Sequence, residues 1–226
     1  MVTVIVIPAL NPTEKLVRLV REIRSLFSPR IVIVNDGSDE QCARVFKELE
    51  LMGDYIITHS RNLGKGAALK TGIRHALSAY PDACGIVTAD ADGQHSPQDI
   101  YRLAQRLTES TDGIVLGVRS VDEKHVPFKS RLGNKITSFV FRLKTGIKLH
   151  DTQTGLRAIP MRYAQSVLQV NGSRFEYEMN MLLFASRMNI PLITIPIGTI
   201  YSDNNRSSHF RPVRDSARIY FDILKF

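Results

Sequence analysis

The sequence predicts an α/β fold, in which helices pack on a mostly parallel sheet. Two observations lead to this prediction. Over residues 1–118, short apolar runs rich in β-branched residues alternate with segments whose apolar residues recur at the helical period. Such runs are typical of strands that are covered on both faces, as in parallel sheets. The strand–helix–strand order favours parallel strands joined by right-handed crossovers.

The first half of the chain supplies five predicted strands with helices between them. The first strand is a near-continuous apolar run that Pro8 ends. The last helix of this half is predicted to follow Ser96, a favourable N-cap, with Pro97 at its first position. The predicted strands are residues 2–7, 31–34, 55–58, 86–89 and 114–118, and the predicted helices are residues 13–27, 41–51, 66–80 and a segment from residue 97.

The second half of the chain is less regular. A helical pattern at residues 129–149 is strongly basic. Because no linker-like stretch separates two units, we expect a single domain over residues 1–226. The other predicted elements are a loop and short strand at residues 151–159, a helix at 178–188, a strand at 192–197, a polar loop at 204–211 and an amphipathic helix at 215–224.

Composition and charge narrow the choice of partner and compartment. The formal net charge of +8 favours an anionic partner such as a nucleotide or a phospholipid surface. We expect no nucleic-acid binding, because the chain carries no RNA-binding motif. The two cysteines, Cys42 and Cys84, indicate neither a disulfide framework nor a zinc site, and they fit a reducing compartment such as the cytoplasm. No apolar run reaches the ~18–20 residues that span a bilayer.

The stretch G-I-V-T-A-D-A-D-G-Q carries the strongest functional signal. A buried-type strand ends there at Asp90 and Asp92, which are followed by a glycine and an amide. In open α/β sheets, ligands bind outside the carboxyl ends of the strands. Mg²⁺ takes carboxylate oxygens and usually shares its other positions with substrate phosphates. The stretch therefore indicates a metal–diphosphate site; the alternative is a strand end with two solvated carboxylates.

Two further strand ends carry polar residues. Asp36 follows the second strand, where it could contact a base or a ribose or could simply form an Asn-Asp-Gly turn. The third strand leads into R-N-L-G-K-G, a glycine-rich helix start in which Lys65 could face a nucleotide or its phosphates. The alternative for Lys65 is a tightly packed helix entry. Three acids at one sheet edge repel one another, and a bound cation and nucleotide would explain them.

Six motifs in order resemble the family 2 glycosyltransferases. They are P-A-L-N, N-D-G-S, R-N-L-G-K-G, D-A-D-G-Q, D-T-Q-T-G-L-R and R-F-E-Y-E-M, and they extend over nearly the whole chain. The pattern is most similar to the branch with dolichyl-phosphate mannose synthases and bacterial polyprenyl-phosphate glycosyltransferases. The resemblance implies a type A glycosyltransferase fold, a Rossmann-like mixed sheet, with a nucleotide-sugar donor and Mg²⁺ or Mn²⁺. Residues 1–118 would then bind the nucleotide-sugar, and residues 119–226 would form the acceptor side.

The resemblance also implies roles on the donor side. Asp36 would contact the base, Asp90 the ribose or sugar, and Asp92 with Gln94 would hold the metal and diphosphate. Pro12 departs from the family, which usually has Glu at that position. The implied donor-binding set is Pro8, Ala9, Asn11, Asp36, Lys65, Asp90, Ala91, Asp92, Arg206 and His209, the last two in a loop over the diphosphate.

On the acceptor side, the resemblance places Asp151 and Gln153 at the reacting centre. Arg157 would bind a phosphate, or would instead pair with Asp151. Glu176 would lie near the donor sugar or the acceptor, although acids also favour a helix start for electrostatic reasons. Arg131 is a further candidate for acceptor binding. The implied catalytic set is Asp90, Asp92, Asp151, Glu176 and Arg206.

The resemblance implies direct displacement with inversion at the anomeric carbon. A phosphomonoester acceptor, with a second pKa of ~6, needs no general base, whereas a glycan hydroxyl needs one. The basic amphipathic pattern at residues 129–148 fits a polyprenyl phosphate held at a membrane surface, or else a core-packed helix with a solvated basic face. We therefore expect a cytoplasmic enzyme, peripheral at the inner leaflet, with a possible membrane-protein partner. The alternatives are a glycan-hydroxyl acceptor and a non-catalytic nucleotide-binding subunit.

Overall fold

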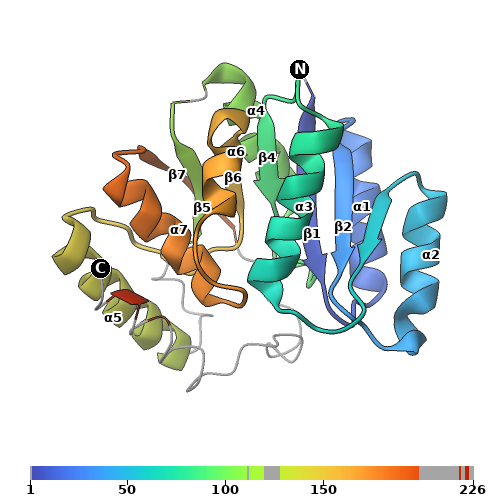
Figure 1. The fold of residues 1–226 in the computed structure, drawn as a ribbon, viewed down its shortest axis with the longest axis horizontal. Coiled ribbons are helices and arrows are strands. Elements are labelled where there is room, and N and C mark those ends of the chain that lie inside the picture. Colours follow the sequence, from blue (N-terminus) through green and yellow to red (C-terminus); the bar gives the residue numbers. More distant parts are fainter. Residues whose placement is uncertain (1, 111, 120–127, 199–218, 220–221, 224–226) are drawn as a thin grey trace.

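The computed structural model describes residues 2–110, 112–119, 128–198, 219 and 222–223, and its centre is a seven-stranded sheet (Figure 1). The strands lie in the order β3-β2-β1-β4-β6-β5-β7, and every neighbouring pair is parallel except the two that β6 makes with β4 and β5. This confirms the predicted α/β class. The strands are β1 (Thr3–Ala9), β2 (Arg30–Asn35), β3 (Tyr55–Thr58), β4 (Gly85–Thr88), β5 (Ile114–Arg119), β6 (Arg157–Pro160) and β7 (Leu192–Ile197).

Helices cover both faces of the sheet, as the ribbon shows for α3 in front and α1 behind (Figure 1). Alternate residues of β1 point to opposite faces, so Val4 and Val6 belong to one hydrophobic core and Ile5 and Ile7 to the other. The helices are α1 (Glu14–Leu26), η1 (Glu40–Cys42), α2 (Ala43–Leu51), α3 (Lys65–Ala79), α4 (Pro97–Glu109), α5 (Phe128–Thr145), α6 (Met161–Leu168) and α7 (Glu176–Arg187).

The helix starts in the first half follow from local chemistry. Thr13 and Ser96 both have extended backbone, and their hydroxyls accept hydrogen bonds from Lys15 N and Asp99 N in the first turns of α1 and α4. As predicted, Pro97 occupies the first helical position of α4, where its missing N–H costs nothing. Helix α3 instead begins after Gly64, which has a φ of 106°.

The second half contains one helix that the sequence did not predict, and it confirms the short strand predicted within residues 151–159 as β6. Helix α6 follows β6 directly, with Pro160 at its N-cap, and was not predicted. It has only eight residues and buries Ala164 and Val167 alone, which gives too short an apolar pattern to recognise. Strand β6 runs antiparallel between β4 and β5, an arrangement set by pairing with strands distant in sequence.

Helix α5 confirms the helix predicted at residues 129–149, but it ends earlier, at Thr145. Among its described side chains, Asn134, Thr137 and Phe141 are buried, whereas Ile136, Phe139 and Leu143 are exposed. The predicted helix at 215–224 lies largely outside the described residues; of it, Ile219 and Ile223 are helical and buried. In the part of the chain that is described, no helix combines the length and hydropathy needed to cross a bilayer.

Candidate active site

Asp90 lies just beyond the carboxyl end of β4, at the centre of an ion-pair cluster. Its Oδ1 is 2.7 Å from Lys65 Nζ, and its Oδ2 is 3.4 Å from His95 Nε2. Lys65 Nζ also lies 3.0 Å from Glu178 Oε2. Lys65 opens α3 and Glu178 belongs to the first turn of α7, so a single cation joins the end of β4 to two helices.

Electrostatics fix the charge state of this cluster. Burial alone would lower the pKa of Lys65, but the Asp90 and Glu178 carboxylates outweigh it and raise that pKa above its usual range. Burial would likewise raise the pKa of Asp90, yet the Lys65 ammonium and His95 hold it well below its usual range. Asp90 is therefore ionised and held in place.

Asp92 has a different environment from Asp90. Its Oδ1 accepts a hydrogen bond from Gln94 N at 2.9 Å, across a turn that Gly93 makes with a φ of 76°. Burial raises the pKa of Asp92, and the negative charge of Asp90 raises it further. Lys65 pairs with Asp90, and no described cation pairs with Asp92, so the carboxylate of Asp92 is the one that a bound cation would stabilise most.

The residues at Asp92 fit a divalent cation of the Mg²⁺ type. The described residues contain no cluster of three or more His, Cys, Asp or Glu side chains that could hold a metal. Mg²⁺ is commonly bound by one or two carboxylates with substrate phosphates and water at its other positions. Asp92, with Gln94 beside it, offers that ligand set, so the predicted metal residues remain the candidates for holding the ion.

The loop that precedes β6 packs directly against Asp90. A Cβ on Gly155 would lie 2.5 Å from Asp90 Oδ2, so only glycine leaves room for that carboxylate. Thr88 Oγ1 donates to Gly155 O at 2.8 Å and ties the loop to the end of β4. The D-T-Q-T-G motif and the D-A-D motif are thus brought together.

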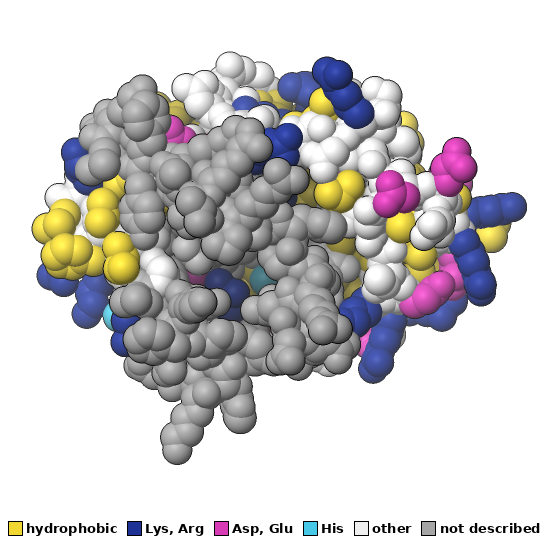
Figure 2. Space-filling view, turned by 90° about the horizontal axis from the view of Figure 1, so that it is seen from below, with side chains coloured by type: hydrophobic (Ala, Val, Ile, Leu, Met, Phe, Trp, Pro, Cys, Tyr) yellow, Lys and Arg dark blue, Asp and Glu magenta, His cyan; other side chains and the backbone are white. Residues whose placement is uncertain are grey.

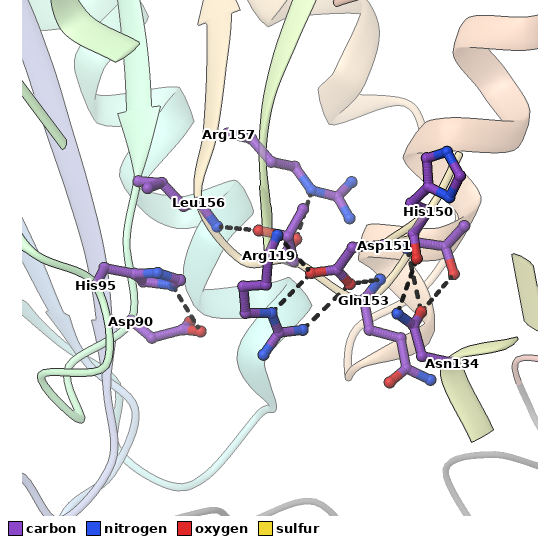
Figure 3. A network of polar contacts seen from close by, with 11 residues as sticks. Asp90, His95, Arg119, Asn134, His150, Asp151, Gln153, Leu156 and Arg157 are labelled. Carbon is purple, nitrogen blue, oxygen red and sulfur yellow. Dashed lines mark hydrogen bonds and ion pairs between the residues drawn. The ribbon is translucent and has the colours of Figure 1, made fainter. Parts of the chain in front are cut away.

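Asp151 is fully buried and pairs with Arg119, at the end of β5 (Figure 3). Arg119 Nε lies 2.7 Å from Asp151 Oδ2 and its Nη2 lies 3.2 Å from Oδ1, which makes the contact bidentate. Gln153 N donates to the same Oδ1 at 3.1 Å. The carboxylate of Asp151 therefore holds the loop and Arg119 together.

Arg157 is not the partner of Asp151 that the sequence suggested as one alternative. Its side chain is buried; Nε donates to Thr154 O at 3.0 Å and Nη1 donates to Glu178 O at 2.5 Å. Burial lowers the pKa of Arg157, opposed chiefly by the charge of Glu178. Its Nη2 is buried without a hydrogen-bond partner among the described residues. Arg157 thus contributes positive charge beneath the cluster and anchors the start of α7.

The carboxylate of Asp36 accepts hydrogen bonds from the glycine-rich loop after β3. Its Oδ1 accepts from Leu63 N at 2.9 Å and lies 2.8 Å from His59 Nδ1, and its Oδ2 accepts from Gly64 N at 2.8 Å. Both oxygens are thus engaged with residues after β3, whereas the Asn-Asp-Gly turn weighed for Asp36 is closed by Asn35, whose Oδ1 accepts from Ser38 N at 2.9 Å. A contact between Asp36 and a base stays a prediction.

Asn11 joins two of the predicted motifs. Its Oδ1 accepts from Asp39 N at 2.8 Å, its Nδ2 donates to Asp39 Oδ2 at 2.9 Å, and its backbone N donates to Ser38 Oγ at 2.9 Å. Asn11 also has a φ of 48°, in the left-handed region where asparagine is favoured. The P-A-L-N and N-D-G-S segments therefore lie side by side beyond the ends of β1 and β2, with Pro8 and Ala9 as the last residues of β1.

Glu176 closes the turn that leads into α7. Its Oε1 accepts from Ser173 N at 3.0 Å and from Arg174 N at 3.1 Å, and its Oε2 is buried without a hydrogen-bond partner among the described residues. Ala91 is half-buried between the two aspartates. Three of the predicted residues cannot be placed: Arg206 and His209 lie outside the described residues, as does the side chain of Arg131.

Sequence reasoning missed three residues of this site. His95 follows D-A-D-G-Q directly, and its position in that stretch was the signal that could have found it. Glu178 is the second acid of the R-F-E-Y-E-M motif, but no role was predicted for it, and none was predicted for Arg119. Nothing in the sequence marks the pairing of Arg119 with Asp151, because it joins two segments that the fold alone brings together.

Comparisons with known proteins agree with these features. Residues 4–168 match the family described as Glycosyl transferase family 2. The chain is 31% identical, over 88% of its length and 86% of the relative's, to a UDP-N-acetylglucosamine–dolichyl-phosphate N-acetylglucosaminyltransferase of Methanococcus voltae. It is 24% identical, over 86% of its length and 76% of the relative's, to a polyprenol monophosphomannose synthase of Mycolicibacterium smegmatis.

A solved structure shares the fold. It is glucosyl-3-phosphoglycerate synthase from Mycobacterium tuberculosis in complex with uridine diphosphate, with a TM-score of 0.70 and 16% sequence identity. The match covers 99% of this chain and 79% of that one. At this identity the likeness supports the α/β architecture, and it agrees with the type A glycosyltransferase fold that the motifs implied.

Proposed function

The chain belongs to glycosyltransferase family 2, and from this premise we propose that it moves a sugar from a nucleotide-sugar donor to a polyprenyl phosphate, with inversion at the anomeric carbon. The donor would be a UDP- or GDP-sugar. An acceptor phosphate oxygen forms the new bond to the anomeric carbon, and the bond from that carbon to the diphosphate breaks. The nucleoside diphosphate leaves with the electron pair.

One observation carries the choice of acceptor. Asp151 and Glu176 are the acids of the implied catalytic set that could act as a general base for a hydroxyl acceptor, and both are engaged within the chain. Asp151 is paired with Arg119, and Glu176 Oε1 accepts two backbone N–H groups. A phosphomonoester has a second pKa of ~6 and is largely dianionic at pH 7, so it attacks without a base. This favours a phosphate acceptor over a glycan hydroxyl.

The relatives support the same acceptor class. The Methanococcus voltae relative is named for transfer to dolichyl phosphate, and the Mycolicibacterium smegmatis relative is named for the synthesis of polyprenol monophosphomannose. Both alignments extend over most of each chain, including the segments that hold Asp90 and Gly155. We therefore carry the acceptor class, and not the particular sugar, to this protein.

Within the proposed reaction, each described residue has a distinct task. Asp90, held ionised by Lys65 and His95, accepts hydrogen bonds from the donor's hydroxyls. Asp92 and Gln94 would hold Mg²⁺ or Mn²⁺, which when bound would neutralise charge on the departing diphosphate. Gly155 and the loop from Asp151 define the acceptor side of Asp90. We keep residues 1–118 as the donor half and 119–226 as the acceptor half of a single domain.

The proposal includes peripheral contact with the cytoplasmic membrane at its inner leaflet, since a polyprenyl phosphate resides in a bilayer. The exposed apolar residues of α5 support this, with basic side chains beside them. Figure 2 shows hydrophobic side chains bordered by Lys and Arg on the side of the molecule where α5 lies. A membrane-protein partner could add to this contact.

Transfer of radiolabelled sugar tests the proposal. UDP-glucose, UDP-N-acetylglucosamine and GDP-mannose are each incubated with undecaprenyl or dolichyl phosphate and Mg²⁺ or Mn²⁺. We expect cation-dependent label in the lipid fraction from one donor, and a loss of about 100-fold or more in Asp92→Asn, because the charge on the leaving group is no longer stabilised. Asp82→Asn, at an exposed position before β4, is the matched control and should keep the activity.

Two results would contradict the proposal. Label in a glycan but not in lipid would identify a hydroxyl acceptor. Binding of a nucleotide-sugar without transfer to any acceptor would identify a non-catalytic nucleotide-binding subunit.

A further inference from the structure

A pocket of about 610 Å³ lies between α5 and the carboxyl ends of β5 and β7. Its volume is within the range of small-molecule sites. The walls combine apolar and basic side chains. The polar and aromatic part of the lining includes Arg119, Lys135, Ser138, Phe139, Arg142 and Lys148.

Helix α5 presents three stripes at helical spacing. Residues 134, 137 and 141 face the core, and residues 135, 138, 139 and 142 line the pocket. The third stripe is apolar and exposed: Ile136 is 44% exposed, Phe139 61% and Leu143 69%. The pocket therefore opens directly beside an apolar ridge, with Phe139 belonging to both.

Three of the four basic residues that line the pocket form no ion pair with a described acid; the fourth, Arg119, pairs with Asp151. Lys135, Arg142 and Lys148 are exposed, and no carboxylate of the described residues pairs with any of the three. The Ser138 hydroxyl is buried and lacks a hydrogen-bond partner in the same described part. The pocket thus offers three positive charges and one unused hydroxyl to an anion.

Arg119 separates the pocket from the proposed catalytic centre. It lines the pocket, but its guanidinium is committed to Asp151, whose loop reaches Asp90 through Gly155. Figure 3 shows Arg119 and Asp151 lying between Asp90 on one side and His150, another lining residue, on the other. The unpaired cationic side chains of Lys135, Arg142 and Lys148 therefore lie at the opening of the pocket beside the apolar ridge. They do not lie on the wall that faces Asp90.

We propose that this pocket binds the headgroup of an anionic phospholipid of the bilayer, as a site distinct from that of the sugar acceptor. The lipid phosphate contacts Lys135, Arg142 and Lys148 and accepts a hydrogen bond from the Ser138 hydroxyl. The glycerol end of the headgroup lies on Phe139. With its acyl chains in the bilayer, such a lipid holds the ridge of α5 at the membrane surface and fixes the orientation of the enzyme. The inference rests on the proposed membrane contact but not on the identity of the acceptor.

Vesicle binding tests this site. The protein is mixed with phosphatidylcholine vesicles that contain or lack phosphatidylglycerol, and the bound fraction is measured by sedimentation. Basic residues near an anionic surface each contribute roughly 1 kcal/mol, so Lys135→Gln/Arg142→Gln/Lys148→Gln should lose affinity for the anionic vesicles by about 100-fold. The matched control is Arg44→Gln/Lys47→Gln/Arg74→Gln, three exposed basic residues on α2 and α3, which should bind nearly as the unchanged protein does.

Further measurements separate the pocket from general attraction and from the acceptor site. Lys144→Gln removes an exposed charge on α5 outside the pocket lining. It should lower the affinity for anionic vesicles less than Arg142→Gln does. Equal vesicle binding by the two triple variants, or equal losses in these two single variants, would overturn the proposal. A second result would also overturn it: the variant Lys135→Gln/Arg142→Gln/Lys148→Gln binds vesicles as the unchanged protein does but has a raised KM for a short, water-soluble polyprenyl phosphate. Thermal unfolding confirms that each variant is folded, and because vesicle binding needs no turnover, failure of the transfer reaction leaves this test intact.

Discussion

At the scale of single residues, the charge balance of the site depends on Lys65. Its ammonium is 2.7 Å from Asp90 Oδ1 and 3.0 Å from Glu178 Oε2, and the second oxygen of Glu178 is buried without a described hydrogen-bond partner. Removing the cation would leave two carboxylates facing each other in a partly buried space. The free-energy cost of leaving these charges unpaired exceeds the net stabilisation that the intact ion pairs contribute.

We predict that Lys65→Met lowers the free energy of unfolding at pH 7 by about 3 kcal/mol, the cost typical of breaking a buried pair. The depressed pKa of Asp90, held down by Lys65 against burial, contributes stability that is present above the unfolded pKa of ~3.9 and lost as pH falls through the folded pKa. The raised pKa of Lys65 contributes stability below ~10.4 that is lost at higher pH. The difference in free energy of unfolding between the unchanged protein and Lys65→Met should thus be constant from about pH 5 to 9 and shrink below ~4.

Urea unfolding over this pH range provides the measurement. Arg44→Met, at an exposed position on α2, is the control and should change the free energy of unfolding little. Equal stability of Lys65→Met and the unchanged protein at pH 7, or a difference that grows as the pH falls, would show that the cluster does not have the charge state derived above.

The sequence located the acids of the site but not their partners. Asp90 and Asp92 are recognisable because they follow a short apolar strand directly, a local pattern. The partner of Asp151 is set by the pairing of β5 with β6 and by the loop before β6, which no local pattern encodes. The choice of Arg157 as a possible partner was wrong for this reason: it is nearer in sequence, but its side chain turns toward α7.

At the scale of elements, the turn before α7 docks on the start of α3. Ala67 N donates to Ser173 O at 2.9 Å, and a Cβ on Gly64 would lie 2.5 Å from the same oxygen. A Cβ on Gly66 would lie 2.5 Å from Tyr177 Cβ. The glycines of R-N-L-G-K-G therefore serve close packing between elements, the alternative that the sequence left open, and this packing places Lys65 between Asp90 and Glu178.

Glu176 holds this turn, and two substitutions distinguish that role from a catalytic one. Glu176→Ala leaves two backbone N–H groups without their acceptor and should cost about 1–3 kcal/mol of stability, with a lower transfer rate. Glu176→Gln keeps an oxygen that can accept both hydrogen bonds, so stability and transfer should stay near those of the unchanged protein. Unfolding and transfer assays on the same preparations provide the comparison. A Glu176→Gln protein with unchanged stability and no transfer would instead place Glu176 at the reacting centre.

Elements of the first half were predictable because each carries its own signal. Strand β1 is a continuous apolar run, and α1 and α4 have side-chain caps and a clear helical period. Helix α6 lacks such a signal: it is short, and it packs on α3 and β4. Strand β6 was predicted only as a short strand, and its antiparallel direction follows from its pairing with β4 and β5. Tertiary contacts, and not local propensity, decide these elements.

At the scale of the whole molecule, three parallel strands bring the motifs proposed for donor binding to one edge of the sheet. β1 pairs in parallel with both β2 and β4, so their carboxyl ends lie together, followed by Asn11, Asp36 and Asp90. Each motif is also tied to its neighbour: Asn11 to Asp39, Asp36 to Gly64, and Lys65 to Asp90. A nucleotide bound at this edge would contact several elements at once and stabilise the fold as a unit.

Thermal unfolding therefore discriminates the donor before any acceptor is known. A nucleoside diphosphate at ~100 times its Kd adds about 2.7 kcal/mol to the free energy of unfolding. For a chain of this size each 1 kcal/mol raises Tm by roughly 2–4 °C, so UDP or GDP with Mn²⁺ should raise Tm by about 5–10 °C. Asp92→Asn should lose the part of the rise that requires the cation, whereas Asp82→Asn should keep it, because Asp82 is exposed ahead of β4 and away from its carboxyl end. A rise with one nucleotide and not the other identifies the base; no rise with either would contradict the placement of the nucleotide at this edge of the sheet.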